Sequence, residues 1–332
     1  MNAEAPWVRI VIVNYNAGAM LQACVDSLSI QTMAAFEAVI VDNGSTDRPV
    51  TNLELPDGRF GILPAGGNLG FAAASNLGAR GAAGPWLAML NPDTRPRQDW
   101  LAELRAATER HPWARMFGST QLSATDPTIA DGFGDILSAY GAAWRTAGGR
   151  PAVELPEMDC EVFSPCAAAA LYATPAFLAS GGFDERFFCY LEDVDLGFRL
   201  RLQGERCVQV RHAEVLHEGS AVAGYLSDFA VYHSYRNRLW LSAKNVPWPL
   251  LPAILPLQAA AIAFALARRP PAFRRAAFKG LRAGLNGLPE ALSDRKDIQR
   301  MRTVTSAAVA RMLVWSPFGR QVRLPYPIPP KL

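Results

Sequence analysis

Short apolar runs, each followed by a polar cluster and an amphipathic stretch, repeat through the first third of this 332-residue chain. The run Val8–Val13 is β-branched and nearly continuous, which is typical of a strand buried on both faces of a parallel sheet. Apolar residues then recur at helical spacing from Met20 to Leu28. The same criteria predict strands at residues 36–41, 60–63 and 86–90, and helices ending near residue 80 and spanning about 98–109. This alternation predicts an α/β doubly wound fold with a mostly parallel sheet and helices on both faces, where ligands bind at the carboxyl ends of the strands.

The pattern is less regular beyond this point. Residues 118–159 are rich in Gly, Ala and Asp, and we predict loop there with at most a hairpin. A buried strand at 167–172, a short helix at 175–180, an amphipathic helix ending at Gly204 and two closing strands at 205–210 and 214–217 follow. We divide the chain into a domain of residues 1–244 and a C-terminal helical extension of residues 245–332.

The composition is that of a folded protein with a sizeable core, because 50% of the residues are apolar and 19% are charged. The net charge of +3 hides an asymmetry. From Arg268 onward 14 basic residues stand against 3 acidic ones, whereas the residues before it carry 19 basic and 27 acidic ones. A basic tail on an acidic body indicates an anionic partner for the tail, either a membrane or a nucleic acid.

The five cysteines are odd in number, scattered and without a CxxC pair. They argue against a disulfide framework or a zinc site and indicate a reducing compartment. The apolar run near the N-terminus, Trp7–Val13, is too short for a signal peptide. We therefore expect a cytosolic protein, at least on its catalytic side.

Polar clusters follow the first two predicted strands. Asn14 and Tyr15 end the first, and Asp42 and Asn43 end the second. Tyr15 could stack on a nucleotide base and Asp42 could accept a hydrogen bond from a pyrimidine N–H. The alternative is that Asn14 and Asp42 are ordinary turn residues, which strand-to-helix loops commonly use.

The fourth strand ends in Asn91-Pro92-Asp93. A carboxylate there can bind a hard divalent cation and leave positions for water and a diphosphate, and Pro92 fixes the direction in which Asp93 projects. His217, at the end of the last predicted strand, is a candidate ligand of the same ion. A plain turn at Asp93 and a structural role for His217 are the alternatives.

The stretch Gly181–Gly204 places Glu192, Asp193 and Asp195 beside several aromatic residues at a helix start. A carboxylate in this position can bind a hydroxyl, accept its proton, or cap the helix. The helix dipole lowers the basicity of such a carboxylate, whereas neighbouring carboxylates raise it.

Six motifs, in order, resemble one known family. They are VIVNYN, VIVDNGSTD, GNLGFAAASNLGAR, LNPDT and GGFDERFFCYLEDVDLGFRLRLQG, with His217 after them. Together they are similar to the inverting glycosyltransferases of the GT-A fold (family 2 type), in the rhamnosyltransferase-like branch. The resemblance runs from about Val8 to about Lys244, and YHSYRNRLWLSAKN, from Tyr232, matches the Arg-Asn stretch that follows the catalytic domain in that branch.

The resemblance implies a role for each matching residue. Asp193 would be the catalytic base, assisted by Glu192, and Asp93 and His217 would bind Mg²⁺ or Mn²⁺. The nucleotide-sugar would contact Asn14, Tyr15, Asp42, Asn43, Asn68, Asn91 and Asp93. Candidates for acceptor or phosphate contacts are Phe188, Tyr190, Asp195 and Arg236. The chain departs from the family at Asn91, where Asp is commoner, and at Thr174-Pro175, where a basic pair is often found; the first change weakens the expected metal affinity.

The implied function is transfer of a sugar, with inversion, from a nucleotide-diphosphate donor to a hydroxyl of a glycan or lipid-linked acceptor in cell-envelope polysaccharide synthesis. The preferred donor is dTDP-rhamnose. Alternatives are a UDP-hexose donor with the same chemistry, or a non-catalytic nucleotide-binding or membrane scaffold protein.

The tail supplies the predicted location. Residues 245–267 carry no charge, but prolines interrupt the first half and leave only Leu257–Ala267 clean. Arg268, Arg269, Arg274 and Arg275 follow closely. An apolar helix before a basic cluster predicts a segment lying on an anionic membrane surface, so we expect a peripheral protein on the inner face of the cell membrane and no nucleic-acid partner. An ordinary core helix covering the sheet is the alternative.

Overall fold

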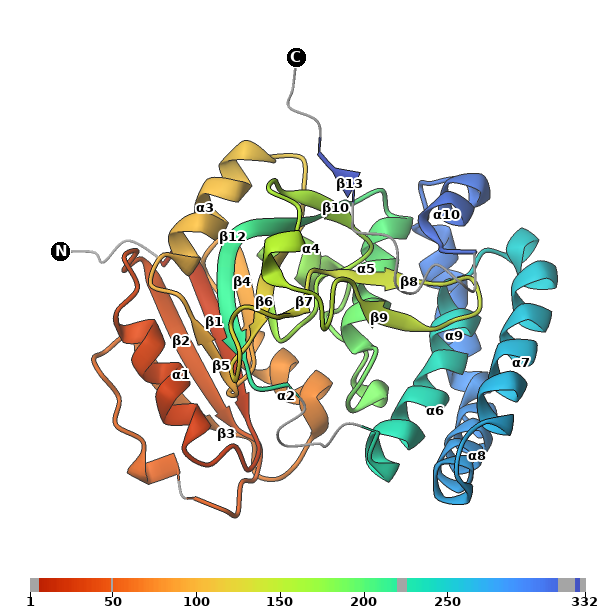
Figure 1. Ribbon diagram of the computed structural model, residues 1–332, viewed down its shortest axis with the longest axis horizontal. Coiled ribbons are helices and arrows are strands. Elements are labelled where there is room, and N and C mark those ends of the chain that lie inside the picture. Colours follow the sequence, from red (N-terminus) through yellow and green to blue (C-terminus); the bar gives the residue numbers. More distant parts are fainter. Residues whose placement is uncertain (1–5, 49, 220–225, 316–325, 329–332) are drawn as a thin grey trace.

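The computed structural model describes residues 6–48, 50–219, 226–315 and 326–328. Its described strands form an 11-stranded mixed sheet flanked by helices, with a bundle of C-terminal helices at one side (Figure 1). The main path through the sheet runs β13-β10-β12-β6-β11-β4-β1-β2-β3, and β5 and β7 pair with β12 and β6. Strands β1 to β4 run parallel, and the antiparallel β11 separates them from the parallel pair β6 and β12. The predicted doubly wound, mostly parallel α/β fold is confirmed.

The strands of this sheet are β1 (Val8–Asn14), β2 (Phe36–Asp42), β3 (Phe60–Pro64), β4 (Trp86–Leu90), β5 (Thr94–Pro96), β6 (Met116–Ser123), β7 (Ala130–Gly132), β10 (Cys160–Val162), β11 (Ala169–Ala173), β12 (Cys207–His217) and β13 (Tyr326–Pro327). A separate hairpin consists of β8 (Asp135–Leu137) and β9 (Ala143–Arg145). The helices are α1 (Met20–Ser29), α2 (Gly70–Ala79), α3 (Trp100–Arg110), α4 (Thr174–Ala179), α5 (Glu192–Leu202), α6 (Asp228–Asn245), α7 (Leu251–Ala267), α8 (Pro271–Asn286), α9 (Leu288–Arg300) and α10 (Ser306–Met312). Short 3-10 turns lie at Val50–Asn52, Ala152–Glu154, Glu185–Phe187 and Trp248–Leu250.

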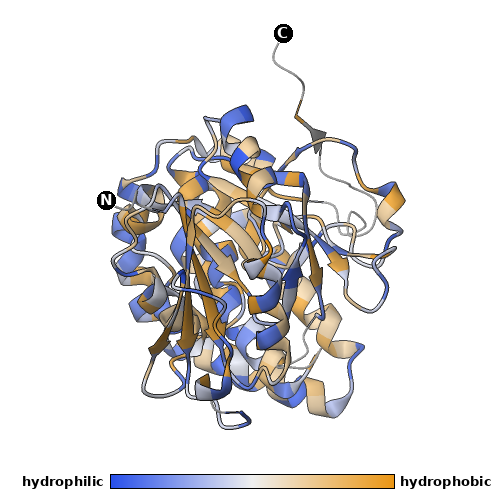
Figure 2. Ribbon diagram, turned by 90° about the vertical axis from the view of Figure 1, so that its left-hand side faces the viewer, coloured by the Kyte–Doolittle hydropathy of each residue, from blue (hydrophilic) through white to orange (hydrophobic). Residues whose placement is uncertain are grey.

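Strand β1 is apolar almost throughout because helices cover both of its faces. Val8, Ile10 and Ile12 pack on one face of the sheet with α1 and α3, whereas Val11 and Val13 pack on the other face with α2, α4 and α5. Side chains alternate between the two faces of a strand, so a strand covered by helices on both sides needs apolar residues at every position. Figure 2 shows the central strands in the hydrophobic colour between helices of mixed colour.

The prediction of loop at residues 118–159 is wrong at its start. Met116–Ser123 forms β6, which lies between β11 and β12 in the middle of the sheet. Its polar residues are buried because they find partners inside: Ser119 Oγ accepts a hydrogen bond from Trp100 Nε1 at 2.8 Å, and Thr120 Oγ1 donates to the carbonyl of Val210 at 3.0 Å. The strand was missed because satisfied polar residues give no apolar run. The hairpin expected in this region is present as β8 and β9.

The strands predicted separately at 205–210 and 214–217 form one continuous strand. Cys207–His217 forms the single strand β12, with an irregularity in its pairing to β6 between Val210 and Glu214. The bulge carries the strand through the polar residues Arg211 and His212, so the apolar pattern is broken although the strand continues.

The C-terminal helices pack mainly on one another and on α5. Helix α8 lies along α6, where Gly280 and Gly284 permit close approach: a Cβ at Gly280 would lie 2.3 Å from the carbonyl oxygen of Tyr232. Helix α7 begins at Leu251, earlier than predicted. Pro252 stands in its first turn, where no N–H is needed, and the helix continues through Pro256 in its interior. It does not cover the sheet, since only 17% of the most apolar 18-residue stretch of Trp248–Ala267 is buried. Among the described residues, Trp248–Ala267 is long and apolar enough to cross a membrane by length and composition alone.

Candidate active site

A cleft of about 630 Å³ lies at the carboxyl ends of β1 and β4, between these strands and the start of α5. It brings together ten of the residues singled out in the sequence: Tyr15, Asn43, Asn68, Asn91, Asp93, Phe188, Tyr190, Glu192, Asp193 and His217. Asn14, Asp42, Asp195 and Arg236 are not among the described residues that line it. The arrangement follows from strand order, because loops after neighbouring parallel strands meet at one edge of the sheet.

One wall of the cleft consists of the loops after β1, β2 and β3. The side-chain amide of Asn43 is buried and links these loops: its Oδ1 accepts from the backbone N–H of Leu69 at 2.8 Å, and its Nδ2 donates to Asn68 Oδ1 at 3.1 Å. Asn68 Oδ1 also accepts from the N–H of Gly70 at 2.9 Å, at the start of α2. Asn43 and Asn68 therefore hold the loop shape, and Tyr15 presents its ring beside them.

Asn14 and Asp42 lie behind this wall and contact Ser45. Asn14 Nδ2 donates to Ser45 Oγ at 2.9 Å, and Asp42 Oδ1 accepts from the N–H of Ser45 at 3.3 Å. These contacts match the turn alternative. A direct nucleotide contact for either residue stays a prediction.

Asp93 and His217 face each other, as expected for two ligands of one cation. His217 Nε2 lies 3.5 Å from Asp93 Oδ1, and both side chains are buried. His217 comes from the end of β12 and Asp93 from the turn before β5, and these strands pair so that His217 lies opposite Thr94. Burial lowers the pKa of His217, but hydrogen bonds to Asp131 and Asp93 outweigh it and raise the pKa above its ordinary value.

Asp131, on β7, orients the imidazole and was missed in the sequence. Its Oδ2 lies 2.7 Å from His217 Nδ1 and also pairs with Arg145. This contact of Nδ1 with a carboxylate orients the ring so that Nε2 faces Asp93, and a carboxylate on the far ring nitrogen is also found behind metal-binding histidines. The sequence gives no signal for Asp131, because it stands in a Gly- and Ala-rich segment with no distinctive spacing.

Asp193 lines the same cleft from the first turn of α5. Its two oxygens accept hydrogen bonds from the backbone N–H groups of Ala167 at 3.0 Å and Val194 at 2.8 Å. Burial raises the pKa of Asp193 above its ordinary value, although these two N–H groups and Arg145 oppose the shift. Burial thus raises the pKa of Asp193 by more than the hydrogen bonds at the helix start lower it, so its position at the start of α5 does not deprive it of basicity.

A second buried carboxylate and a thiol stand next to Asp193. Asp135 of β8, Cys166 and Asp193 each have one oxygen or sulfur atom within 4.8 Å of the others. Burial raises the pKa of the Cys166 thiol to about 12, so it is protonated at neutral pH, and Arg145 lies beside the group as a cation. This trio is therefore a poor metal site. Asp135 and Arg145 were also missed in the sequence.

Glu192 is buried beside Asp193. Its Oε2 has no hydrogen-bond partner among the described residues. Burial, with the nearby charge of Asp193, raises the pKa of Glu192 well above its ordinary value. Because the pKa of Glu192 is raised well above its ordinary value, Glu192 holds its proton more strongly than an ordinary carboxyl group. Asp193 is therefore the better candidate for the ionised base.

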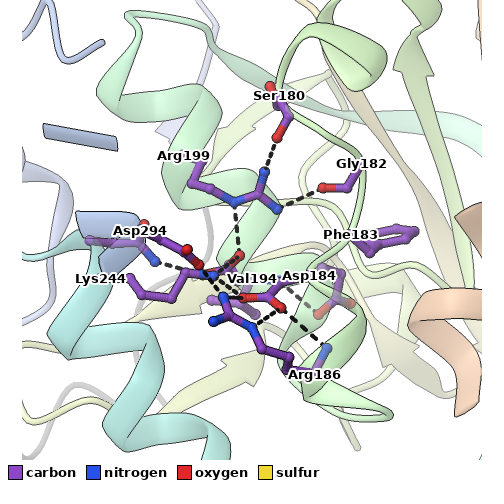
Figure 3. A network of polar contacts seen from close by, with 12 residues as sticks. Ser180, Gly182, Phe183, Asp184, Arg186, Val194, Arg199, Lys244 and Asp294 are labelled. Atoms are coloured by element: carbon purple, nitrogen blue, oxygen red, sulfur yellow. Dashed lines mark hydrogen bonds and ion pairs between the residues drawn. The ribbon is translucent and has the colours of Figure 1, made fainter. Parts of the chain in front are cut away.

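Asp195 and Arg236 serve the frame of the site. Asp195 is fully buried and pairs with Arg199 at 2.8 Å and Lys244 at 3.2 Å. Arg236 donates to the backbone carbonyl of Phe187 at 2.6 Å. Figure 3 shows Lys244, Asp184, Arg186, Arg199 and Asp294 in one polar network. Asp195 joins this network through Arg199 and Lys244 and so connects α5 with the C-terminal helices. The suggestion that Asp195 or Arg236 contacts the acceptor finds no support in this arrangement.

Comparison with known proteins bears on this geometry. The family model described as "Glycosyl transferase family 2" matches residues 9–121. The N-acetylglucosaminyl-diphospho-decaprenol L-rhamnosyltransferase of Mycobacterium tuberculosis is 32% identical over 266 residues, which cover 72% of this chain and 85% of that protein. A PGL/p-HBAD biosynthesis glycosyltransferase of Mycobacterium bovis is 35% identical over 127 residues, or 37% of this chain and 50% of its own length.

Solved structures of the same fold are more distant in sequence. The mannosyltransferase PcManGT from Pyrobaculum calidifontis, solved with GDP-Man and Mn²⁺, matches with a TM-score of 0.52 and 16% identity, over 90% of this chain and 86% of that one. GalNAc-T7, solved with UDP, GalNAc and Mn²⁺, gives a TM-score of 0.62 and 14% identity, over 91% of this chain and 59% of that one. With the fold, the ordered motifs and a relative matched over most of both lengths, the chain belongs to glycosyl transferase family 2, in its rhamnosyltransferase-like branch.

Proposed function

We propose that this glycosyltransferase moves a sugar, with inversion, from a nucleotide-diphosphate donor to a hydroxyl of a glycan or lipid-linked acceptor in cell-envelope polysaccharide synthesis, and that the donor is dTDP-rhamnose. The observation that carries the proposal is that one cleft is lined by both the Asp93–His217 pair and Asp193. The relative from Mycobacterium tuberculosis, whose name gives an L-rhamnosyl donor group and an N-acetylglucosaminyl-diphospho-decaprenol acceptor, supports the choice of substrates.

In this proposal Asp193 is the base. The acceptor hydroxyl oxygen attacks the anomeric carbon from the face opposite the diphosphate, its proton passes to Asp193, and the bond to the diphosphate breaks, so the configuration inverts. General base catalysis of this kind contributes about 10²–10⁴-fold to the rate. The raised pKa of Asp193 favours its uptake of the acceptor proton. Phe188 and Tyr190 line the cleft beside it and form the proposed acceptor wall.

Asp93 and His217 fit a divalent cation, Mg²⁺ or Mn²⁺. The pair offers a carboxylate and an imidazole nitrogen whose other ring nitrogen already contacts Asp131, in a buried position open to the cleft. When bound, the ion neutralises negative charge that develops on the leaving diphosphate. Asn91 lies beside the pair as a neutral group, so the chain supplies a single carboxylate from this turn.

The test is a panel of nucleotide sugars. We expect the purified protein to turn over dTDP-rhamnose with an N-acetylglucosaminyl-diphospho-polyprenol acceptor, to be inactive in chelator, and to recover with Mn²⁺ or Mg²⁺. His217→Ala should weaken Mn²⁺ binding by about 10–100-fold, measured by electron paramagnetic resonance, because it removes a ligand from a site with one carboxylate. His212→Ala, on the same strand, is the matched control.

Preferred turnover of a UDP-hexose would replace the donor in this proposal and leave the chemistry intact. Absence of turnover with every donor, together with retained nucleotide binding, would instead favour a non-catalytic nucleotide-binding protein. Full activity in chelator would remove the metal from the mechanism.

We further propose that residues 245–332 form an extension of the catalytic domain, residues 1–244, and attach the enzyme peripherally to the inner face of the cell membrane. Leu255 and Phe264 are exposed on α7, Phe278 and Leu285 on α8, and basic side chains stand close by. The exposed basic residues are Arg268, Arg269, Arg274, Arg275, Lys279 and Arg282. Apolar side chains beside a basic cluster are suited to the surface of an anionic bilayer.

Charge reversal tests the membrane proposal. Arg274→Glu with Arg275→Glu should weaken binding to phosphatidylglycerol-containing vesicles, by roughly 1 kcal/mol for each basic residue lost, and Phe264→Asp should add to the loss. Vesicle sedimentation measures the effect. Arg105→Glu, an exposed change on α3, is the control. Unchanged binding in the α8 double variant would contradict the proposal.

A further inference from the structure

The loop that leads into α5 has an unusual backbone. Phe188, Tyr190 and Leu191 all have positive φ, at +63°, +71° and +66°. Side chains other than glycine rarely adopt this region, because Cβ crowds the neighbouring carbonyl oxygen. Residues held in such conformations persist only where their surroundings determine them, and they concentrate at functional sites. Something must therefore hold residues 187–191 in place.

The side-chain amide of Asn237, on α6, holds them. Its Nδ2 donates to the backbone carbonyl oxygens of Phe187 at 3.0 Å, Cys189 at 2.9 Å and Tyr190 at 2.7 Å. Asn237 is fully buried, so water does not compete for these contacts. The two hydrogens of this one amide group are thus shared among three carbonyl groups that the irregular backbone leaves without partners in a helix or strand, and Phe187 also accepts from Arg236 at 2.6 Å.

The orientation of this amide is fixed by its neighbours. On one side it meets carbonyl oxygens, which only accept hydrogen bonds. On the other side its Oδ1 accepts from Arg236 Nε at 2.8 Å, and a guanidinium only donates. Turning the amide over would place acceptor against acceptor and donor against donor. Aspartate at this position would likewise present an oxygen to the three carbonyls.

The loop joins both walls of the cleft. The carbonyl oxygen of Phe188 accepts from the N–H of Ala72 at 3.2 Å, in the first turn of α2 on the nucleotide side. The carbonyl oxygen of Leu191 accepts from the N–H of Asp195 at 2.9 Å and so forms the first turn of α5, which carries Asp193. The position of the loop therefore sets the distance between the nucleotide wall and the proposed base.

Helix α6 supports the loop at a second point. His233 lies one turn before Asn237 on the same face of the helix, and its ring stacks on Phe188 with centroids 5.4 Å apart and planes inclined by 16°. Burial lowers the pKa of His233 to about 4, so the stacked ring is neutral at physiological pH.

We propose that Asn237 is a positioning residue for glycosyl transfer: its amide holds the loop of residues 187–191, in which Phe188, Tyr190 and Leu191 have positive φ, and so places Asp193 and the aromatic side chains relative to the loops after β1, β2 and β3. This rests on the proposed function, because it assigns Asn237 to the geometry of that same reaction. The residue does not touch the substrates; it acts through the loop.

The variants Asn237→Ala and Asn237→Asp test it. We expect kcat for transfer to fall roughly 10- to 100-fold, the usual cost of misplacing a reacting group by about an ångström. Binding of dTDP with Mn²⁺, measured by calorimetry, should change by less than about twofold, because the nucleotide wall has its own hydrogen bonds. Amide hydrogen exchange in residues 187–192 should become faster. Asn286→Ala, an exposed asparagine on α8, is the control and should change none of these.

A second substitution that restores kcat would distinguish a positioning role of Asn237 from a general loss of stability. Leu191→Gly makes one left-handed residue free of steric cost, so combining it with Asn237→Ala should restore at least part of the lost kcat and slow the exchange of the loop again. A kcat within twofold of wild type in Asn237→Ala would overturn the proposal. So would equal losses in kcat and dTDP binding that Leu191→Gly fails to rescue. If the wild-type protein transfers no sugar, the proposed function fails, whereas hydrogen exchange still decides whether Asn237 holds the loop.

Discussion

Replacing Asp193 by asparagine should lower kcat for sugar transfer by about 10²–10⁴-fold while leaving nucleotide binding within about twofold of wild type. Asparagine has the same shape, and its Oδ1 can still accept one of the hydrogen bonds from Ala167 and Val194. It cannot take up the proton of the acceptor hydroxyl. Product formation measures kcat, and calorimetric titration with dTDP and Mn²⁺ measures binding.

The pH dependence provides an independent check on the same residue. Transfer requires ionised Asp193, and burial raises the pKa of Asp193 above that of a free aspartate. The rate should therefore fall as the pH drops through this raised pKa, so the acidic limb of kcat/KM should lie above the pKa of an unperturbed aspartate, about 3.9. Asp57→Asn, on an exposed loop, is the control and should leave both rate and profile unchanged. Wild-type turnover in Asp193→Asn would assign the base to another group, with Asp135 and Glu192 the nearest candidates.

Replacing Lys244 by methionine should lower the free energy of unfolding by about 3–5 kcal/mol, because it leaves buried carboxylates without their cation. Lys244 is only 2% exposed, and its ammonium group pairs with Asp184 and, at 3.2 Å, with Asp195. Burial opposes ionisation of Asp184, but hydrogen bonds from Arg186 and Lys244 hold its pKa below the ordinary value. Both carboxylates thus depend on nearby cations to remain charged inside the protein.

Urea denaturation at neutral pH measures the loss. Lys279→Met, at an exposed position of α8, is the matched control and should change the free energy of unfolding by less than about 0.5 kcal/mol. A loss below about 1 kcal/mol in Lys244→Met would show that Arg186 and Arg199 satisfy the two carboxylates without it. The network also predicts that a chain ending at residue 244 is unstable, since Asn245 donates to Asp195 at 2.8 Å and Asp294 pairs with Arg186.

Much of the fold could be predicted because its signals are local. Strand β1 is apolar at every position since both its faces are covered, and α1 repeats at helical spacing since one face is covered. Strand β6 was missed because its polar residues are satisfied by distant partners such as Trp100 and Val210. The continuity of β12 was missed because an irregularity between Val210 and Glu214 interrupts its apolar pattern. No local pattern reveals a hydrogen bond to a residue far along the chain.

The candidate site divides in the same way. The sequence by itself determined which residues end the parallel strands and begin α5, and so it placed Asp93, Asp193 and His217 at one edge of the sheet. Only the tertiary structure decided that Asp131 orients His217 and that Asn237 holds the loop before α5. The tertiary structure likewise decided that Asp195 pairs with Lys244 and does not line the cleft. The physical reason is that periodicity fixes how a segment buries its own side chains, whereas the partner of a buried polar group is chosen by strand order and helix packing between segments distant in the sequence.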